Sequence, residues 1–458
     1  MNRTSLAERL AEANSSTGPV LFTDALSFTA GALRAAAERL PLSGERRSGD
    51  VALHLASPLK LAVALLALDG IAGRILLLSP ATPPDAAADL IARFGPGTNL
   101  TDQARRPHSE VETVLWADDV SAPEPAGPLP PGRRDTLWTL ATSGTTGTPK
   151  LVAHRLASLT RTTKAANGRP NCWRWGLLFD MARFAGVQVF LQGVLGGGGL
   201  VLPDPEAPLA SQVETLIRQG CAALSATPTM WRKLLMTTEA RALQLRQVTL
   251  GGEIADDSVL GALAARFPDA RIAHIYASTE AGAAFSVLDG QAGFPASYLH
   301  EPPGGVRLRV TGGRLAVHNE AVSPDYVGGG ARFADPDGFI DTGDVVERVG
   351  DRFQFRGREN GAINVGGNKV FPEEVEQQLL AHRLVASARV HAKASPITGQ
   401  LVAAEIVPAD ACADPKALIA DLRARCRETL QPWQVPASIK VVSQLATNLG
   451  GKVERRPS

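Results

Sequence analysis

The sequence contains little cysteine, and its few cysteines are isolated. Among 458 residues there are four, Cys172, Cys221, Cys412 and Cys426, and no two of them form a CxxC pair. A zinc site or a dithiol redox centre built on paired cysteines is therefore not expected. Isolated thiols are typical of reduced cytosolic proteins, so we expect a cytoplasmic location.

The sequence also lacks an excess of charge of either sign. It has 47 Lys and Arg residues and 46 Asp and Glu residues, which gives a formal net charge of +1. Proteins that bind nucleic acid through its phosphates need a strongly basic surface. The charge balance argues against a nucleic-acid partner, and the short pair Arg455-Arg456 does not change this.

No long hydrophobic run is present. Residues 1–21 mix polar and charged side chains and lack the apolar core of a signal peptide. The most apolar stretch, 61–78, is interrupted by Asp69, Arg74 and glycine. Because a membrane-spanning helix needs about 20 mostly apolar residues, we expect a buried helix followed by a strand here, and no membrane span.

What the sequence does have is a regular alternation of helical and strand-like segments. A chain of 458 residues is longer than one hydrophobic core usually serves, so two or more domains are expected. The alternation predicts layered α/β structure. The early segments are expected to be a helix over 27–40, a strand over 51–55, a helix over 61–68 and a strand over 75–78.

The pattern changes after about residue 300, where short strands separated by turns begin. The last hundred residues are expected to form a small α+β unit, in which Pro372 opens a helix and Leu418, Leu422, Cys426 and Leu430 mark one buried helical stripe. We predict a boundary near Arg358. The expected domains are residues 1–357 and 362–458, joined by a hinge over 358–361.

The most informative segment follows an apolar strand expected over 137–141. It contains two glycines, five hydroxyl side chains and a lysine, and reads TSGTTGTPK over 142–150. Glycines let a tight backbone turn point its N–H groups inward, and hydroxyls and a lysine add donors and positive charge. This composition predicts a cradle for a polyphosphate. The spacing differs from that of a Walker loop.

At this point the sequence resembles the acyl-adenylate-forming enzymes, a family that includes acyl- and aryl-CoA synthetases, stand-alone adenylation domains and firefly luciferase. The loop over 142–150 is the signature of that family. Further motifs follow in the family's order along nearly the whole chain. They are GGE at 251–253, IYASTEAG at 275–282, DTGD at 341–344, FRGREN at 355–360, INVGGNKVFPEEVE at 363–376 and NLGGKVERR at 448–456.

The resemblance implies a fold and an activity. The fold would be α/β, with a large multi-layer α/β N-terminal domain and a small mobile α+β C-terminal domain. The activity would be magnesium-dependent activation of a small carboxylic acid by ATP, giving an acyl-adenylate and pyrophosphate. The acyl group would then pass to a thiol, either coenzyme A or the phosphopantetheine of a separate carrier protein.

The resemblance also assigns the residues that bind ATP or AMP. Tyr276 would stack on adenine, Thr279 would reach the α-phosphate, Glu280 would hold Mg²⁺, and Asp344 with Arg358 would bind the ribose hydroxyls. A carboxylate suits a diol because it can accept both hydrogens. The remaining nucleotide-binding residues would be Thr142, Ser143, Gly144, Thr145, Thr146, Gly147, Lys150, Gly251, Gly252, Glu253 and His274.

Two positions depart from the family pattern in this motif. His274 stands where the family often has Asn, and it either packs as an ordinary histidine or contacts the edge of adenine. Ala277 stands where Gly is usual, so its methyl group is expected near the substrate carboxylate and would trim the pocket. Both departures lie where substrate and nucleotide should meet.

Two further sites follow from the resemblance alone. Lys452 would be the mobile catalytic lysine that bridges the substrate carboxylate and the α-phosphate, where negative charge accumulates in the transition state. The hinge residue is Asn360, where the family usually has Asp or Lys; the following glycine preserves backbone freedom. Gly366 and Gly367 would line the channel of the incoming thiol after the small domain rotates.

The acyl pocket is expected to draw on 179–184, 225–227, Gly251-Gly252 and Ala277. Arg183 is either a solvated arginine or recognises a polar or anionic group on the acid. Phe179-Asp180 is similar to the start of the substrate motif of amino-acid adenylation domains, in which the Asp binds an amino group, although the spacing to the next glycines fits CoA ligases better. The expected lining residues are Phe179, Asp180, Arg183, Phe184, Ala226 and Ala277.

Four interpretations remain open from sequence. The first is a free-standing acyl- or aryl-CoA ligase, and the second is a ligase that loads an acyl, aryl or amino acid onto a separate carrier protein. A third passes the adenylate to an amine or another nucleophile. The fourth is a non-catalytic nucleotide-binding relative, which the presence of Lys150, Glu280, Asp344, Arg358 and Lys452 disfavours.

Overall fold

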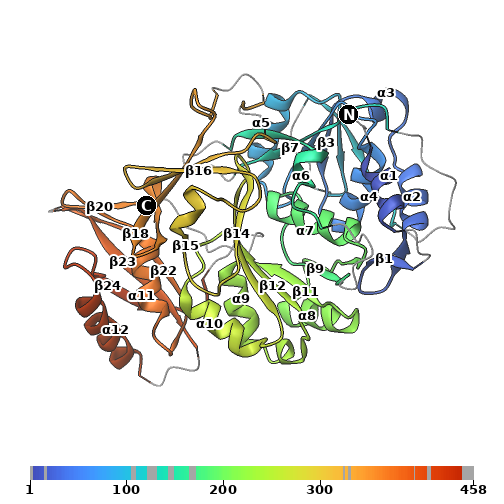
Figure 1. Cartoon of the computed structure of the whole chain (residues 1–458). Coiled ribbons are helices and arrows are strands. Elements are labelled where there is room, and N and C mark those ends of the chain that lie inside the picture. Colours follow the sequence, from blue (N-terminus) through green and yellow to red (C-terminus); the bar gives the residue numbers. More distant parts are fainter. Residues whose placement is uncertain are drawn as a thin grey trace.

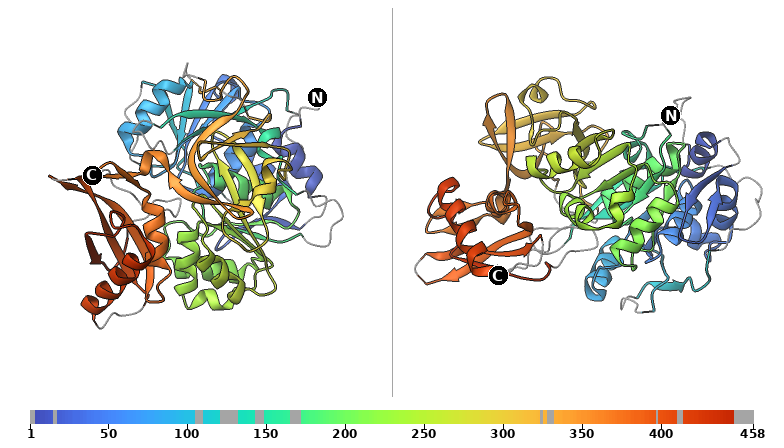
Figure 2. Two further views of the ribbon diagram at one scale, coloured as in Figure 1. Left: turned by 60° about the vertical axis from the view of Figure 1, so that its left-hand side comes forward. Right: turned by 90° about the horizontal axis from the view of Figure 1, so that it is seen from below.

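The structure is a computed structural model of the whole chain, drawn in Figures 1 and 2. The residues that it describes are 4–14, 18–104, 110–120, 132–142, 149–164, 172–322, 325–327, 332–396, 398–409 and 414–445.

A six-stranded sheet lies in the N-terminal third of the chain. Its strands are parallel except for the last pair, and its order is β6-β5-β3-β4-β7-β8. The predicted apolar segment 61–78 is confirmed as a buried helix followed by a strand. The strands are β3 (Val51–His54), β4 (Arg74–Leu77), β5 (Thr98–Thr101), β6 (Glu112–Leu115), β7 (Leu137–Ala141) and β8 (Leu151–Arg155). Helix α3 (Gly44–Ser48) precedes them, α4 (Pro58–Leu68) and α5 (Pro84–Phe94) lie between them in sequence, and α6 (Leu156–Leu159) follows them.

Local sequence explains the helix that fills the centre of this region. Ser57 caps α4 by accepting a hydrogen bond from the backbone N–H of Lys60, and Pro58 occupies the first turn, where its missing N–H costs nothing. Its residues 60–68 are all buried. A helix that is apolar on every side is expected to be surrounded by protein, and α4 packs against helices on one side and strands on the other.

An eight-stranded sheet follows, with order β14-β13-β12-β11-β9-β10-β1-β2. Its central strands are parallel, as expected for strands joined by helices. The strands are β1 (Pro19–Phe22), β2 (Ser27–Thr29), β9 (Trp175–Leu177), β10 (Leu200–Val201), β11 (Ala223–Ala226), β12 (Gln247–Gly251), β13 (Arg271–Ser278) and β14 (Gly282–Val287). The helices of this part are α1 (Leu6–Ala13), α2 (Ala30–Glu38), α7 (Phe184–Leu195), α8 (Leu209–Arg218), α9 (Pro228–Met236) and α10 (Asp257–Arg266), with a 3₁₀ turn over Glu239–Ala242.

The two faces of this sheet belong to different cores. Leu224, Val248 and Leu250 pack with α8, α9 and α10 in one buried cluster. Leu177 instead packs with α7 and with the six-stranded sheet in the largest cluster of the molecule. Side chains alternate between the two faces of a strand, so adjacent residues of β11 and β12 point to opposite sides of the sheet.

A five-stranded antiparallel sheet closes the large domain, with order β15-β19-β18-β17-β16. Its core combines apolar residues from its strands with Phe285 of β14. The predicted turn over 336–338 is present, where Asp335 accepts hydrogen bonds from the N–H groups of Gly338 and Phe339. The elements are β15 (Phe294–Pro295), a 3₁₀ turn over Ala296–Leu299, β16 (Arg307–Thr311), β17 (Arg314–His318), β18 (Ile340–Val349) and β19 (Arg352–Arg358).

The C-terminal unit has its own sheet and its own hydrophobic core, as the sequence predicted. It stands beside the large domain in all three views and is coloured orange to red in Figures 1 and 2. Its α11 contacts β19, and its β22 contacts α9. Its elements are β20 (Ile363–Val365), β21 (Asn368–Val370), α11 (Pro372–Leu380), β22 (Val385–Ser395), β23 (Gly399–Pro408), α12 (Pro415–Thr429) and β24 (Ser438–Val441).

The fold agrees with the α/β architecture predicted from sequence, with a large N-terminal and a smaller C-terminal domain. β19 ends at Arg358, and a 3₁₀ turn over Glu359–Gly361 connects it to the small unit. The boundaries at 357 and 362 and the hinge function of this turn remain predictions. Within the described part of the chain, no helix combines the length and the apolar character needed to cross a bilayer.

Candidate active site

A cavity of about 2530 Å³ lies where the carboxyl ends of β11, β12 and β13 meet β18 and the small domain. Ligands of open α/β sheets bind at the carboxyl ends of the strands, so this is the expected place for a site. Most residues predicted from sequence line this cavity. They are Thr142, Lys150, Phe179, Asp180, Arg183, Phe184, Gly251, Gly252, Glu253, His274, Tyr276, Ala277, Thr279, Glu280, Asp344, Arg358 and Asn360.

Several predicted residues are not among the described ones or lie elsewhere. Ser143, Gly144, Thr145, Thr146, Gly147 and Lys452 fall outside the described residues. Gly366 and Gly367 form the exposed turn between β20 and β21 and do not line the cavity.

The prediction for Ala226 needs a correction. Ala226 is 1% exposed and packs on the helix-covered side of β11, in the cluster that contains Leu224. The alternation of side chains along the strand instead directs Ser225, from the same predicted segment, to the cavity.

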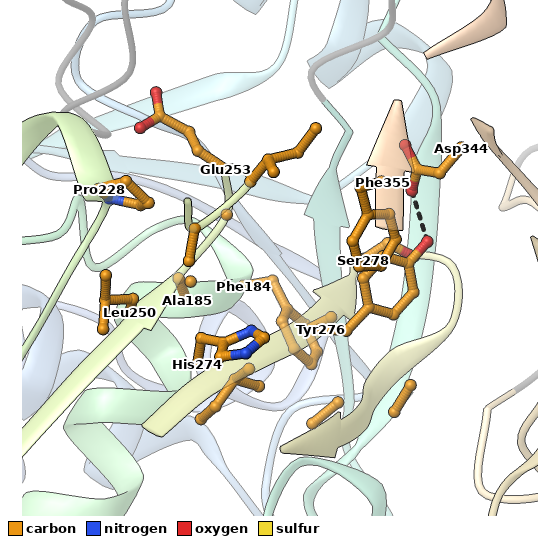
Figure 3. A pocket seen from close by; sticks show the side chains of 18 of the residues that line it. Phe184, Ala185, Pro228, Leu250, Glu253, His274, Tyr276, Ser278, Asp344 and Phe355 are labelled. Atoms are coloured by element: carbon orange, nitrogen blue, oxygen red, sulfur yellow. Dashed lines mark hydrogen bonds between the residues drawn. The ribbon is translucent and has the colours of Figure 1, made fainter. Parts of the chain in front are cut away.

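The carboxylate of Asp344 is held by two neighbours from different strands. The Tyr276 hydroxyl donates a hydrogen bond to Asp344 Oδ2, drawn as the dashed line in Figure 3. Arg358 Nε lies 3.1 Å from Asp344 Oδ1, and Arg358 Nη2 donates to the carbonyl of Thr342 at 2.6 Å. A carboxylate has about four acceptor positions, so it can accept from protein donors and from a diol together.

Tyr276 is protonated in this arrangement. Burial, and then the charge of Asp344, raise the pKa of its phenol well above the ordinary value. Its ring stacks on Phe285 at a centroid distance of 5.1 Å and on Phe355 at 5.2 Å. Figure 3 shows the Phe355 ring lying over Tyr276 beside Asp344. The stack fixes the tyrosine ring at the wall of the cavity.

The ends of the phosphate loop come together at the carboxyl end of β7. The Thr142 N–H donates to the Lys150 carbonyl at 2.8 Å, and the Lys150 N–H donates to Thr142 Oγ1 at 3.2 Å. Lys150 Nζ lies 4.7 Å from the centre of the Tyr326 ring. Burial, and then the charge of Glu280, raise the pKa of Tyr326. Lys150, Tyr326 and Glu280 all line the cavity.

His154, which the sequence did not suggest, connects this loop to the motif that contains Thr279. Its Nε2 lies 2.9 Å from the Thr279 carbonyl, and its ring packs against Phe184 at 5.4 Å. It is 2% exposed, and burial lowers its pKa to about 4. A neutral imidazole that donates from Nε2 satisfies this geometry. His154 thereby links β8 to the end of β13.

Two predicted nucleotide-binding residues have structural partners. Glu253 accepts a hydrogen bond from the Thr229 N–H at 3.0 Å, at the start of α9. His274 Nε2 lies 3.0 Å from the Gln291 carbonyl, and burial lowers the pKa of its imidazole. Both side chains still border the cavity in Figure 3. The His274 imidazole therefore has a protein partner, as an ordinary packed histidine would.

At the acyl end, Asp180 and Arg183 lie in the turn before α7. The Asp180 side chain is 4% exposed, and its Oδ1 accepts a hydrogen bond from the Ala182 N–H at 2.9 Å. Its Oδ2 is buried and has no hydrogen-bond partner among the described residues, with Arg183 Nε at 3.6 Å. Arg183 is 38% exposed, so its charge remains available to a ligand.

The structure adds residues that sequence reasoning did not select. Trp175, Gln247 and Thr249 line the cavity on the floor formed by the eight-stranded sheet. The sequence pattern that could have identified them is the alternation of polar and apolar residues in a strand that is buried on both faces. Tyr326 carried no such signal, and Phe355 begins the motif over 355–360 but was assigned no role there. Only the fold brings these two side chains to Lys150 and Tyr276.

The joint between the domains carries a run of ion pairs. Arg314 of β17 pairs with Asp341 and, at 3.4 Å, with Glu359. Glu359 also accepts from Lys369 Nζ of the small domain at 2.7 Å. Asn360 follows Glu359 and lines the cavity. These pairs are exposed, so each contributes at most about 1 kcal/mol and the joint can rearrange at low cost.

Comparison with known proteins agrees with this geometry. The sequence profile described as AMP-binding enzyme matches residues 29–328, and the profile described as AMP-binding enzyme C-terminal domain matches residues 374–452. A probable 2-succinylbenzoate–CoA ligase of Mycobacterium tuberculosis is 31% identical over 342 residues, which cover 70% of this chain and 83% of the relative.

Two other proteins are similar. A D-alanine–D-alanyl carrier protein ligase of Staphylococcus aureus is 26% identical over 350 residues, which cover 70% of each protein. The crystal structure of an anthranilate CoA ligase in complex with anthranoyl-AMP superposes with a TM-score of 0.80 and 17% identity, covering 99% of this chain and 96% of that chain. At this identity the structural match shows a shared fold.

Proposed function

The chain belongs to the AMP-binding enzyme family, and from this premise we propose that it is an AMP-forming ligase that joins a carboxylic acid to a thiol. In the first step it converts the acid and ATP to an acyl-adenylate and pyrophosphate. In the second step the thiol of coenzyme A takes the acyl group and AMP leaves. The similarity to a probable CoA ligase over most of both chains supports coenzyme A as the thiol.

One observation carries this proposal more than any other. A single cavity is lined by the Asp344–Arg358–Tyr276 cluster, by Lys150 and Glu280, and by a third group of residues at and before α7. The first cluster suits a ribose, and the second suits phosphates. The third compartment leaves room for an acid whose carboxylate meets the α-phosphate between them.

The first step requires two anions to meet. A carboxylate oxygen attacks the α-phosphorus, a new C(O)–O–P bond forms, and the bond to pyrophosphate breaks. Lys150 and Lys452 are proposed to offset the negative charge that accumulates on phosphoryl oxygens, which is the kind of stabilisation that changes rates most. Thr279 is proposed to donate to the α-phosphate from the end of β13.

The residues present could hold a magnesium ion if the phosphates of ATP supply the remaining ligands. The described residues contain no cluster of three or more His, Cys, Asp or Glu side chains that would hold a metal alone. Mg²⁺ commonly binds through one or two carboxylates together with substrate phosphates. Glu280 is the carboxylate that would hold it here, and the ion would neutralise phosphate charge.

The second step needs a different arrangement of the small domain. We propose that the small domain, from about residue 362, rotates about Asn360 and exchanges the segment of Lys452 for the turn that contains Gly366 and Gly367. That turn is exposed and lies outside the cavity, so the rotation would not have to break a buried contact of the turn. The weak exposed ion pairs at the joint are consistent with such a motion.

A second function is favoured by a specific observation, the buried Asp180 oxygen without a hydrogen-bond partner. Such a carboxylate would suit the ammonium group of an amino acid. The alternative is therefore a ligase that loads an amino acid onto a separate carrier protein, and the similarity to a D-alanine–D-alanyl carrier protein ligase supports it. Transfer of the adenylate to an amine would use the same first step.

Product analysis tests the proposal. The enzyme should consume ATP in the presence of a suitable acid and release AMP and pyrophosphate in equal amounts. Addition of coenzyme A should give an acyl thioester detectable by mass spectrometry. Thioester on a phosphopantetheine carrier but not on coenzyme A would favour the alternative, and release of ADP would contradict both.

A further inference from the structure

The floor of the acyl compartment is formed by paired rows of residues on the eight-stranded sheet. In one row, Leu177 of β9, Ser225 of β11, Thr249 of β12 and Ala273 of β13 are register partners. All but Leu177 line the cavity. Two residues further from the nucleotide end, the next row contains Trp175, Ala223, Gln247 and Arg271, of which all but Ala223 line the cavity.

This floor is polar, whereas the other face of the same strands is apolar. Leu224, Val248 and Leu250 alternate with the floor residues and pack against helices, and Leu250 also borders the cavity near the end of β12. Ser225 is 7% exposed, Thr249 is 4% exposed and Gln247 is 7% exposed. Central strands covered on both sides usually carry apolar residues throughout. The hydroxyl and amide groups on the face toward the cavity are an exception to this pattern, and the exception needs a physical reason.

The polar groups of the floor have unused hydrogen-bonding capacity. Gln247 Nε2 donates to Thr249 Oγ1 at 3.1 Å and to the Val248 carbonyl at 3.3 Å. Within the described part of the chain, neither the Gln247 side-chain oxygen nor the hydroxyl hydrogen of Thr249 has a partner. The Ser225 hydroxyl borders the same cavity. None of these three side chains contributes an atom to the fully buried polar atoms that lack a partner, so their polar groups face open space in the cavity, where water or a ligand can bind them.

The wall opposite the floor does not supply these partners. Gln188 and Gln192 of α7 border the cavity, but their amides hold the segment after α6. Gln188 Nε2 donates to the Leu159 carbonyl at 2.8 Å, and Gln192 Oε1 accepts from the Lys164 N–H at 2.9 Å. Phe184 and Ala185, seen in Figure 3, complete this wall with apolar surface.

We propose that the compartment selects a carboxylic acid with a neutral hydrogen-bonding substituent, such as a hydroxyl or an aromatic amino group, about 7 Å from its carboxylate. The carboxylate belongs at the strand ends near Gly251 and Ala277, and two residues along a parallel strand span about 6.6 Å. The substituent therefore meets Ser225 and Thr249. The inference rests on the proposed function, because that function places the carboxylate at the strand ends.

The proposal excludes an unsubstituted alkyl acid as the preferred substrate. An alkyl chain on this floor would remove water from three polar groups without replacing its hydrogen bonds. Sites that hydrogen-bond a substrate hydroxyl discriminate strongly against analogues without it, because the protein groups are left unpaired. Trp175 and Phe184 provide flat apolar contacts to the rest of the molecule.

The test compares matched pairs of probes. 4-Hydroxybenzoate and 4-methylbenzoate, and 6-hydroxyhexanoate and heptanoate, have similar shapes but differ in the substituent. Pyrophosphate exchange gives kcat/KM for each acid, and calorimetry gives the Kd of the corresponding non-reactive acyl sulfamoyl-adenosines. In at least one pair the hydroxylated member should be preferred roughly 10-fold or more by both measures. A preference for the methyl members in both pairs would overturn the proposal.

Substitutions of the floor residues test which side chains cause the preference for the hydroxylated acid. Thr249→Val keeps the side-chain shape and removes the hydroxyl, so it should reduce the preference ratio roughly 10-fold, and Ser225→Ala should reduce it in the same direction. The control is Thr139→Val, because Thr139 is fully buried in the other sheet, its hydroxyl has no partner in the described structure and it does not line the cavity. Unchanged ratios in folded Thr249→Val and Ser225→Ala would contradict the proposal.

The two measurements separate the two proposals. If no acid supports pyrophosphate exchange in the wild type, the proposed function fails, while the Kd ratio of the sulfamoyl-adenosines still decides the polarity of the compartment. If exchange is rapid and the ratio is near one in both assays, the proposed function stands and the selectivity inference is wrong.

Discussion

The two ends of the cavity differ in how their polar groups are satisfied. At the nucleotide end, Asp344 is held by Tyr276 and Arg358, and His154 is bonded to the Thr279 carbonyl. At the acyl end, the Ser225 hydroxyl faces the cavity, and one buried Asp180 oxygen has no hydrogen-bond partner among the described residues. A preorganised site suits a ligand that is always the same, such as ATP. Unpaired polar groups indicate the part of the site whose partner is the variable substrate.

The largest expected effect concerns the nucleotide end. Lys452→Ala should reduce ATP–pyrophosphate exchange by about 10²–10³, because it removes a charge that stabilises the transition state. The same variant should convert a synthetic acyl-adenylate to thioester at a near-normal rate. Measurement of both half-reactions in one folded preparation checks this. Equal losses in both would mean that Lys452 does not serve the first step alone.

Glu280→Ala should also reduce exchange by about 10²–10³, since it removes the carboxylate proposed to hold magnesium on the phosphates. The loss should be similar for every acid tested, because Glu280 belongs to the nucleotide end. The exposed Glu320→Ala is the matched control. If Glu280→Ala instead reorders the acids, the division between the two ends does not hold.

Protonation of His154 should affect stability with a definite sign. Its pKa of about 4 in the folded protein lies below the ordinary 6.5, so the unfolded chain takes up the proton first. The folded state therefore loses stability as pH falls from about 6.5 to about 4, by about 2 kcal/mol between pH 7 and pH 5. Nothing should change above pH 7.

Urea unfolding at pH 7 and pH 5 measures this contribution. His154→Gln keeps a donor for the Thr279 carbonyl and should lose less stability between the two pH values than the wild type. His382→Gln, at a histidine paired with the exposed Asp421, serves as the comparison. Equal pH dependence in wild type and His154→Gln would show that the link between β8 and β13 does not depend on a neutral imidazole.

The smallest expected effect concerns the acyl end. Arg183→Ala should change the order of preferred acids by several-fold while the KM for ATP stays within about twofold, because a partly exposed charge contributes at most about 1 kcal/mol. Arg218→Ala on the exposed side of α8 is the control. Loss of activity for all acids alike would assign Arg183 to the catalytic machinery.

The same division explains what could be predicted from sequence. The nucleotide end is built from contiguous motifs, so Asp344, Glu280 and Lys150 could be selected by their place in a recognisable order. The acyl end is built from single residues on separate strands and helices. The spacing around Asp180 left its register open, and only the strand pairing shows that Ser225, and not Ala226, faces the cavity.

The fold was predicted more completely than the contacts. A short apolar stretch identified α4, and an apolar run before the glycine-rich loop identified β7. Periodicity does not report which distant segments meet. The position of His154 against Thr279, and of Tyr326 beside Lys150, depends on tertiary packing between elements more than 100 residues apart in sequence.

The central claim is that the carboxylate itself attacks the α-phosphorus of ATP, and isotope transfer tests it most directly. The acid is labelled with oxygen-18 at both carboxylate oxygens and incubated with the enzyme, ATP, magnesium and coenzyme A. The account predicts that each AMP carries one oxygen-18 atom in its phosphate and that pyrophosphate carries none. Oxygen-18 in orthophosphate released with ADP, or AMP without the label, would contradict it.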